Sequence, residues 1–196
     1  MQLNEFIGST GYEILQCFDY DGYDALHCLN GKPSAKKWKP IRVRRVRPSR
    51  RQGFRPSDAP WACVGDILVF RRSAVDALRD ILDAHGELLP LEDEGGVELY
   101  AYNPRALDAL DQVLSKGPRD DDGKLEGATY HVFIPSLVQG VDVFRLARER
   151  CGDIYVSDRF VERWKQAKLK GLDFRLVWDS DLPPEGQPGP WKPGQK

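Results

Sequence analysis

The sequence lacks a long apolar run. No stretch approaches the roughly 20 residues that cross a bilayer, and the N-terminal segment MQLNEFIGSTGYEILQCF lacks the basic start and apolar block of a secretory signal. It also lacks an excess of either charge, because 29 lysines and arginines stand against 30 aspartates and glutamates, for a formal net charge of −1. No global field therefore attracts nucleic acid or anionic membranes. We expect a cytoplasmic protein with no membrane partner.

Residues for metal binding are sparse and scattered. No two cysteines form a CxxC pair, and the histidines are far apart, whereas a zinc site needs closely spaced ligands. The residues concerned are Cys17, Cys28, Cys63, Cys151, His27, His85 and His131. We expect no metal, and reduced, mostly buried thiols that behave as small hydrophobic side chains.

Catalytic motifs are missing from the sequence as well. It contains no GxSxG elbow and no HExxH pair. Gly8–Gly11 (GSTG) resembles a phosphate loop but lacks the Gly-Lys-Ser/Thr ending and the following helix, so we predict a turn. We interpret His85, at an expected helix end, and His131, beside strand residues, as structural. The sequence therefore predicts no enzyme, no catalytic residue and no cofactor.

What is present describes a folded protein of 196 residues, 41% hydrophobic and 30% charged. Helical and strand periodicities both occur, which predicts an α+β fold of mixed or antiparallel sheet elements and several amphipathic helices. Residues 1–182 are expected to form a single globular domain or two joined lobes, about 1–95 and 96–182. The Pro/Gly-rich tail, 183–196, is predicted to be disordered.

Three helices carry start and stop signals. A Ser or Asn precedes each helical pattern as the cap, and Gly ends the first and third, the first in a left-handed conformation. The expected caps and stops are Ser73 and Gly86, Asn103 and Ser115–Pro118, and Ser157 and Gly171.

Alternating or short apolar runs predict strands between and around these helices. They cover Tyr12–Phe18, Ile41–Val46, Asp66–Phe70, Leu88–Leu91, Tyr130–Ile134 and Leu172–Trp178. An acidic turn is expected after Phe18, and Asp142–Arg150 fits either a strand or a helix. The order strand, serine, helix, glycine, strand occurs from Gly65 and again from Gly152, which indicates similar local architecture or a duplication.

A basic segment, Lys36–Arg55, contains no acidic residue. We weigh three interpretations: a solvated strand face, a docking surface for an acidic protein, or a nucleic-acid contact with Trp38 or Phe54 stacking on bases. The rest of the chain is net acidic and no nucleic-acid motif surrounds the segment, which disfavours the third. The candidate partner-binding residues are Arg42, Arg44, Arg45, Arg47, Arg50 and Arg51.

Two acidic clusters form an alternative contact surface. Each lies beside glycine in a hydrophilic stretch, where nothing tunes a carboxyl pKa for catalysis and adjacent residues do not converge on one ion. We therefore interpret them as solvated loops or as a contact for a basic partner. Their members are Glu92, Asp93, Glu94, Asp120, Asp121 and Asp122.

Three further segments carry a family resemblance: Ser73–Leu91 (SAVDALRDILDAHGELLPL), Tyr100–Ser115 (YAYNPRALDALDQVLS) and Val143–Trp178, with its VFRL, IYVSDRFVERW and GLDFRLVW blocks. On these residues the chain resembles immunity family eleven, a bacterial domain family of polymorphic toxin systems that was long of unknown function. The matching positions are mostly core and cap positions, and the basic segment has no counterpart.

The resemblance implies an immunity protein that binds and neutralises a cognate secreted or contact-delivered toxin. Because the N-terminal segment lacks a secretory signal, we expect that toxin to act in the cytoplasm. It carries over no catalytic residue, and the variable surface would select the toxin. Two other hypotheses remain: a nucleic-acid-binding accessory protein that uses residues 36–55, and an enzyme acting on a small molecule or a modified protein. The oligomeric state has no signal in the sequence.

Overall fold

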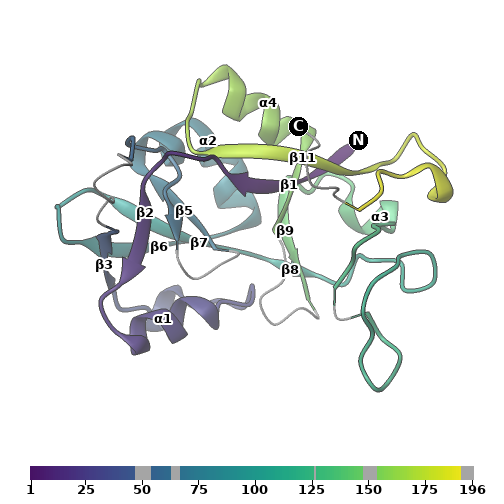
Figure 1. Cartoon of the computed structure of the whole chain (residues 1–196), viewed down its shortest axis with the longest axis horizontal. Helices are drawn as coiled ribbons and strands as arrows, with labels where there is room; N and C mark the ends of the chain where they lie inside the picture. The colour runs from purple at the N-terminus through teal and green to yellow at the C-terminus, as the bar shows by residue number, and fades with distance from the viewer. Residues whose placement is uncertain (47–53, 63–66, 126, 148–153, 191–196) are drawn as a thin grey trace.

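The computed structural model describes residues 1–46, 54–62, 67–125, 127–147 and 154–190. Within these residues the chain forms two mixed β-sheets and several helices (Figure 1), which confirms the predicted α+β class. The five-stranded sheet, in the order β11-β1-β10-β9-β8, contains β1 (Gln2–Gly8), β8 (Ala106–Leu107), β9 (Val143–Leu146), β10 (Ile154–Ser157) and β11 (Leu172–Asp179).

The six-stranded sheet, in the order β4-β2-β3-β6-β7-β5, contains β2 (Ile14–Cys17), β3 (Ile41–Arg45), β4 (Trp61–Ala62), β5 (Leu68–Arg71), β6 (Gly86–Asp93) and β7 (Leu99–Pro104). The helices are α1 (Tyr20–His27), α2 (Arg72–His85), α3 (Pro135–Val138) and α4 (Asp158–Gln166), with short 3-10 helices at Ala35–Lys37 and Pro184–Gly186. None of the helices in the described part of the chain has the length and apolar character needed to cross a membrane.

The two sheets share a central core that contains α2 and α4. On β5, Leu68 and Phe70 face this core while Val69 faces away, as the period of two along a strand requires. On β10, Val156 faces the central core and Tyr155 faces away. Both sheets therefore contribute a face to one core among the described residues (Figure 1).

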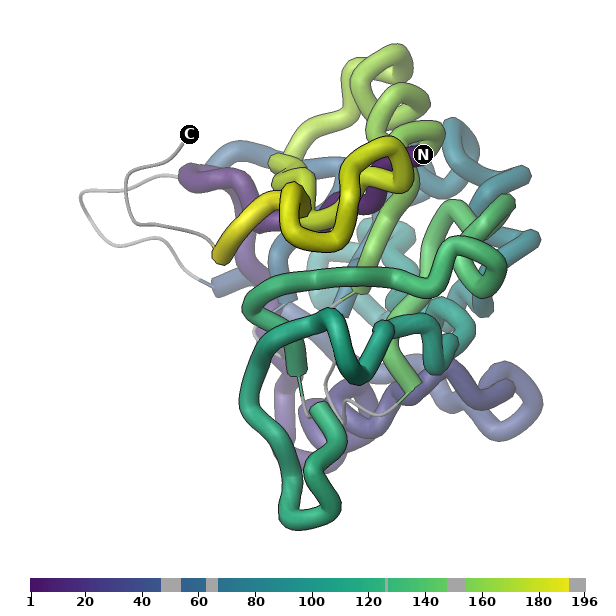
Figure 2. Tube along the Cα trace, turned by 90° about the vertical axis from the view of Figure 1, so that its right-hand side faces the viewer, coloured from purple at the N-terminus to yellow at the C-terminus, as the bar shows by residue number. Residues whose placement is uncertain are grey.

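Each sheet has a second apolar face with its own cover. Helix α1 places Leu26 against the outer face of the six-stranded sheet, together with Leu29. The long segment between β8 and β9 covers the outer face of the five-stranded sheet, where Phe133 and Val138 are buried. Figure 2 shows this segment as the green tube that crosses the front of the molecule.

The two sheets repeat one local architecture. In the first unit, β5-α2-β6, both strands pair antiparallel with β7, which lies between them. In the second, β10-α4-β11, both strands pair antiparallel with β1 in the same way. These are the two segments whose order of signals matches in the sequence, so the similarity extends to strand pairing. Helices α2 and α4 of the two units pack against each other.

The predicted helix at Asn103 is wrong. Asn103 lies within β7, and its side chain accepts a hydrogen bond from Gly31 N–H (2.8 Å) and donates one to Lys32 O (2.9 Å). This long-range contact takes the place of a helix cap, and the next residues form β8 and turns. The apolar stripe expected on a helix is divided: Leu110 is buried whereas Leu114 is 43% exposed.

The signals around α2 are also used differently from the prediction. Ser73 lies inside the helix, and its hydroxyl donates to Asp58 instead of capping it. Gly86 has a φ of 179°, which is extended and not left-handed, because the helix runs directly into β6. A glycine is still required there, since a Cβ would lie 2.6 Å from Asn103 O.

Two other expectations differ from the structure. The acidic turn after Phe18 is helix α1, which Asp19 caps by accepting a hydrogen bond from Gly22 N–H (2.7 Å). Tyr130–Ile134 contributes isolated bridges, such as Leu110 with Phe133, and forms no continuous strand. The ambiguous stretch Asp142–Arg150 forms strand β9 as far as Leu146, and its residues 148–150 lie outside the described part.

The first part of the Pro/Gly-rich tail, as far as residue 190, contacts the rest of the chain. Gln187 is only 6% exposed, and its amide group donates to the Asp179 and Leu182 carbonyls (2.9 Å each). Tyr130 adds a hydrogen bond to Pro184 O. These contacts hold the start of the tail against the end of β11, where it is the yellow tube of Figure 2. Residues 191–196 lie outside the described residues.

Candidate partner-binding surfaces

The basic strand β3 divides its arginines by alternation. Ile41 and Val43 point into the core beneath α1, so Arg42 and Arg44 point to solvent. Both guanidinium groups lie over the ring of Phe18, 4.5 and 5.2 Å from its centroid. This cation–π contact orients the two side chains. These two residues therefore form an exposed cationic patch.

Arg45 has a structural position instead. Its Nε lies 2.7 Å from Glu13 Oε2, and its Nη1 lies 3.1 Å from the buried carboxylate of Asp93. Burial raises the pKa of Glu13, but hydrogen bonds from Ser57 N–H, Arg71 and Arg45 outweigh that effect and hold the pKa below its usual value. Arg45 therefore joins the end of β3 to Glu13, just before β2, and to Asp93, the last residue of β6.

The remaining predicted arginines, Arg47, Arg50 and Arg51, lie outside the described residues. Of the two aromatic residues proposed to stack on bases, Trp38 is committed to the fold: its ring N–H donates to Pro90 O (2.8 Å) and it packs on the core under α1. Phe54 is half-buried.

The acidic alternative does not form one surface. Glu92 lies opposite Arg42 in the β3–β6 register, with Nε and Oε1 3.8 Å apart, Asp93 is buried, and Glu94 is exposed. The loop with Asp120–Asp122 is exposed and projects at the far end of the molecule from β3 (Figure 1). The first acidic cluster therefore partly neutralises the basic strand, and the second stands apart.

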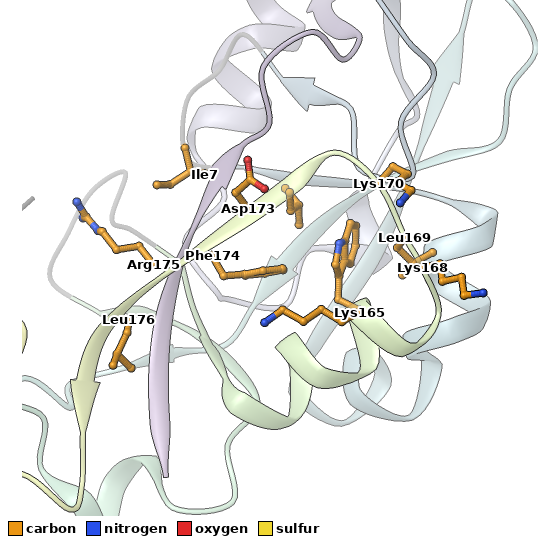
Figure 3. A pocket seen from close by; sticks show the side chains of 11 residues that line it. Ile7, Lys165, Lys168, Leu169, Lys170, Asp173, Phe174, Arg175 and Leu176 are labelled. Atoms are coloured by element: carbon orange, nitrogen blue, oxygen red, sulfur yellow. The ribbon is translucent and has the colours of Figure 1, made fainter. Parts of the chain in front are cut away.

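A third surface was not predicted from the sequence. A groove of about 1110 Å³, here called the β11 groove, runs along β11 and the turn after α4 (Figure 3). Its apolar lining consists of Ile7, Trp164, Leu169, Leu172, Phe174 and Leu176. Its charged lining consists of Lys165, Lys168, Lys170, Asp173 and Arg175.

The groove combines an apolar floor with exposed cations at its rim. Phe174 packs its ring against Trp164, with centroids 6.1 Å apart, and points toward α4 in Figure 3. Lys165, Lys168 and Lys170 are exposed, and none of them forms an ion pair with a described residue. The sequence signal was the run KQAKLKGLDFRL, in which three lysines precede an alternating strand.

A buried polar cluster at the end of α2 superficially resembles a catalytic triad. The cluster consists of His85, Asp142 and Ser157, and Asp142 lies between the other two. Its carboxylate accepts a hydrogen bond from Ser157 Oγ (2.7 Å) and lies 3.4 Å from His85 Nε2. The serine is therefore not activated by the histidine, and its Oγ also caps α4 at Phe160 N–H. Burial, with the nearby Arg105, lowers the pKa of His85 despite Asp142. The arrangement connects α2 to α4.

His131 belongs to a second buried cluster beneath the five-stranded sheet. Its Nε2 lies 3.0 Å from Tyr155 Oη and 3.4 Å from a carboxylate oxygen of Glu5. Glu5 in turn accepts a hydrogen bond from Arg175. Burial, followed by the charge of Arg175, lowers the pKa of His131 to about 4, so the ring is neutral at pH 7. This histidine is a structural hydrogen-bonding residue.

Metal and thiol chemistry find little support among the described residues. Within that part of the chain, no group of three or more His, Cys, Asp or Glu side chains could hold a metal ion. Cys28 is exposed and Cys17 half-buried, so the expectation of buried thiols is wrong for both. Cys63 and Cys151 lie outside the described residues.

The sequence was compared with curated proteins and with models of known protein families. A search of curated proteins finds no match. The sequence model of the immunity protein family (Imm11) matches residues 101–179, which span β8 to β11 and all of the β11 groove except Ile7. The basic segment and Ser73–Leu91 lie outside this match. The resemblance predicted from the sequence is therefore confirmed over residues 101–179, which match the immunity protein family Imm11.

Proposed function

We propose that this protein binds and neutralises a cognate bacterial toxin, secreted or delivered by contact, that acts in the cytoplasm. The observation that carries the proposal is the match of residues 101–179 to a family of immunity proteins. Neutralisation by binding needs a tight complex, and it needs no reactive centre in the immunity protein. Complementary charge would speed the encounter, and buried aromatic or arginine anchors would slow release.

The use of the polar side chains supports a binding role. His85, Asp142 and Ser157 connect two helices, and His131 is buried beneath a sheet. Enzymatic sites instead place titratable groups at an accessible cavity, where substrate can reach them. The β11 groove is lined by apolar and charged residues, and its lining contains no histidine, serine or cysteine among the described residues.

The exposed arginines of β3 remain a proposed contact surface. Arg42 and Arg44 would contribute to it directly, with Arg47, Arg50 and Arg51 as further members. Arg45 would act by holding the strand in place, since its guanidinium group is paired with Glu13 and Asp93. The acidic loop Asp120–Asp122 is the rival surface, because a nuclease toxin would present a basic groove to it.

A nucleic-acid-binding accessory protein is the alternative function, and the exposed Arg42–Arg44 patch is the observation that favours it. The commitment of Trp38 to Pro90 argues against base stacking there. The alternative predicts that affinity for a generic duplex falls steeply as salt rises, with a slope set by the number of phosphate contacts.

The test begins with the adjacent gene for a secreted protein with a variable C-terminal domain. Co-expression of that domain should kill cells that lack this protein and spare cells that contain it, and the purified pair should form a stable complex. A cell that survives equally well without this protein would remove the proposed function. A double reversal, Arg42→Glu with Arg44→Glu, should weaken the complex if β3 is the contact surface. Lys32→Glu with Lys124→Glu is the control with the same charge change at other exposed sites.

A further inference from the structure

The strand β11 forms an open edge of the five-stranded sheet. Its inner neighbour is β1, and the described residues place no strand on its outer side. Such an edge presents unpaired backbone N–H and C=O groups, which can accept another extended chain as an added strand. The β11 groove lies along this edge and includes residues from both faces of the strand.

The register identifies which backbone groups point outward. Ser9 N–H donates to Gly171 O, and the same antiparallel ladder pairs Ile7 with Asp173. Hydrogen-bonded and non-hydrogen-bonded pairs alternate along such a ladder. Asp173 and Arg175 therefore direct their backbone groups to β1, and Phe174 directs its N–H and C=O away from the sheet.

The side chains around this edge define the chemistry of a ligand. Phe174 and Leu176 are half-buried and offer apolar contact on the face toward α4. Lys165, near the end of α4, and Lys168 and Lys170, in the turn before β11, are exposed and have no acidic partner among the described residues. Asp173 is the one acidic residue in the lining, against three lysines and Arg175, so the lining is net positive. An incoming strand would therefore meet an apolar strip bordered by positive charge.

Hydrogen bonds hold the turn between α4 and β11, which carries Lys168 and Lys170, in place. Lys170 N–H donates to Asp58 Oδ2 (2.8 Å), and Asp58 N–H donates back to Lys170 O (2.9 Å). Gly171, with a φ of 112°, lies so close to Ser57 that a Cβ would meet its Oγ at 1.9 Å. A fixed turn lowers the ordering cost of binding, because the groove does not have to form when the ligand arrives.

We propose that the toxin supplies an extended acidic segment that adds to β11 as an outer strand of the sheet. This inference rests on the proposed function. The backbone of the segment pairs with Phe174, its apolar residues pack on Phe174 and Leu176, and its carboxylates lie near Lys165, Lys168 and Lys170.

A second copy of the chain is the rival occupant. The segment Leu172–Leu176 (LDFRL) is nearly self-complementary, since antiparallel pairing about Phe174 would set Asp173 opposite Arg175 of the other copy. Two observations argue against it. Arg175 is already bound to Glu5, and self-pairing would bring two lysine-rich rims together. The positive charge of the lysines attracts an acidic partner, whereas it would repel the same lysines of a second copy.

The first experiment uses calorimetry to measure the affinity of this protein for the toxin domain encoded by the adjacent gene. Lys165→Glu with Lys170→Glu should weaken binding by about tenfold or more at low salt, whereas Lys32→Glu with Lys124→Glu should leave it nearly unchanged. Wild-type protein that does not bind any such toxin would defeat the proposed function itself. Wild-type binding that both double variants retain equally would defeat only the role of the groove.

The second experiment follows the Phe174 amide by hydrogen exchange. In the free protein it should exchange fast while the Arg175 amide, bonded to β1, is protected; in the complex both should be protected. A synthetic peptide of alternating valine and glutamate should shift the Phe174 amide resonance at millimolar concentration, and a valine–lysine peptide should not. Equal shifts with both peptides, or a Phe174 amide that stays unprotected in the toxin complex, would overturn the proposal. So would a dimer that protects this amide without any partner.

Discussion

Nε of Arg45 lies 2.7 Å from Oε2 of Glu13, so the two side chains join the end of β3 to the residue just before β2. Ser57 N–H and Arg71 bind the other carboxylate oxygen of Glu13, so one carboxylate organises three separate segments. The sequence presents Arg45 as one member of a basic run with Arg42 and Arg44. Their burial and partners show that Arg45 belongs to the fold and that the other two belong to the surface.

Replacing Arg45 by alanine should destabilise the protein by about 2–3 kcal/mol, because it leaves the buried Asp93 carboxylate without its cation and Glu13 with Arg71 alone. Arg44→Ala should change the free energy of unfolding by less than about 0.5 kcal/mol, because that side chain is exposed. Urea unfolding at pH 7 measures both. Equal effects of the two substitutions would show that the cluster around Glu13 contributes no more than a surface contact.

His131 should make stability depend on pH below neutrality. Its pKa is depressed to about 4 in the folded protein from 6.5, so the unfolded chain takes up a proton first as the pH falls. The contribution of neutral His131 to the free energy of unfolding is complete above pH 6.5. It is lost as the pH falls toward 4, by about 3 kcal/mol in total. His131→Gln should flatten the pH dependence of the urea midpoint in this window. An unchanged profile in the variant would assign the effect to other groups.

Local signals in the sequence predict the second half of the fold well where nothing distant competes. Ser157 caps α4 as expected, by accepting a hydrogen bond from Phe160 N–H, and β11 follows the predicted alternation. Asn103 carries an equally good cap signal, but its side chain binds the backbone of Gly31 and Lys32, more than 70 positions earlier. A contact of that range has no local pattern, so the predicted helix was wrong.

The β11 groove could not be predicted for the same reason. Its lysines and alternating strand are visible in the sequence, but its character as a sheet edge depends on β1, from the opposite end of the chain. Glycine positions have a similar limit. Gly86 was expected to be left-handed, but its φ is 179° because α2 continues directly into β6. Gly171, expected only to end its helix, is the glycine with a positive φ, 112°.

Gly171→Ala should be more harmful than the same change at Gly123. Both glycines have positive φ, 112° and 75°, so alanine is strained at each by about 1 kcal/mol. A Cβ at Gly123 meets nothing within 4 Å, whereas at Gly171 it meets Ser57 Oγ at 1.9 Å and Ala59 O at 2.7 Å. We expect about 3 kcal/mol of destabilisation at Gly171, measured by thermal or urea unfolding. A Gly171 variant as stable as the Gly123 variant would mean that the turn beside Asp58 is free to move.

The family-matched stretch, residues 101–179, should not fold when expressed alone. Within the described residues β11 joins the rest of its sheet through β1, which pairs with β11 on one side and β10 on the other. Without residues 2–8 the stretch loses that ladder, and without α2 the core around α4 is exposed to water. Its amide NMR spectrum should show the narrow dispersion of an unfolded chain, while residues 1–190 should give a dispersed spectrum. A well-dispersed spectrum from 101–179 alone would show that this stretch folds without β1.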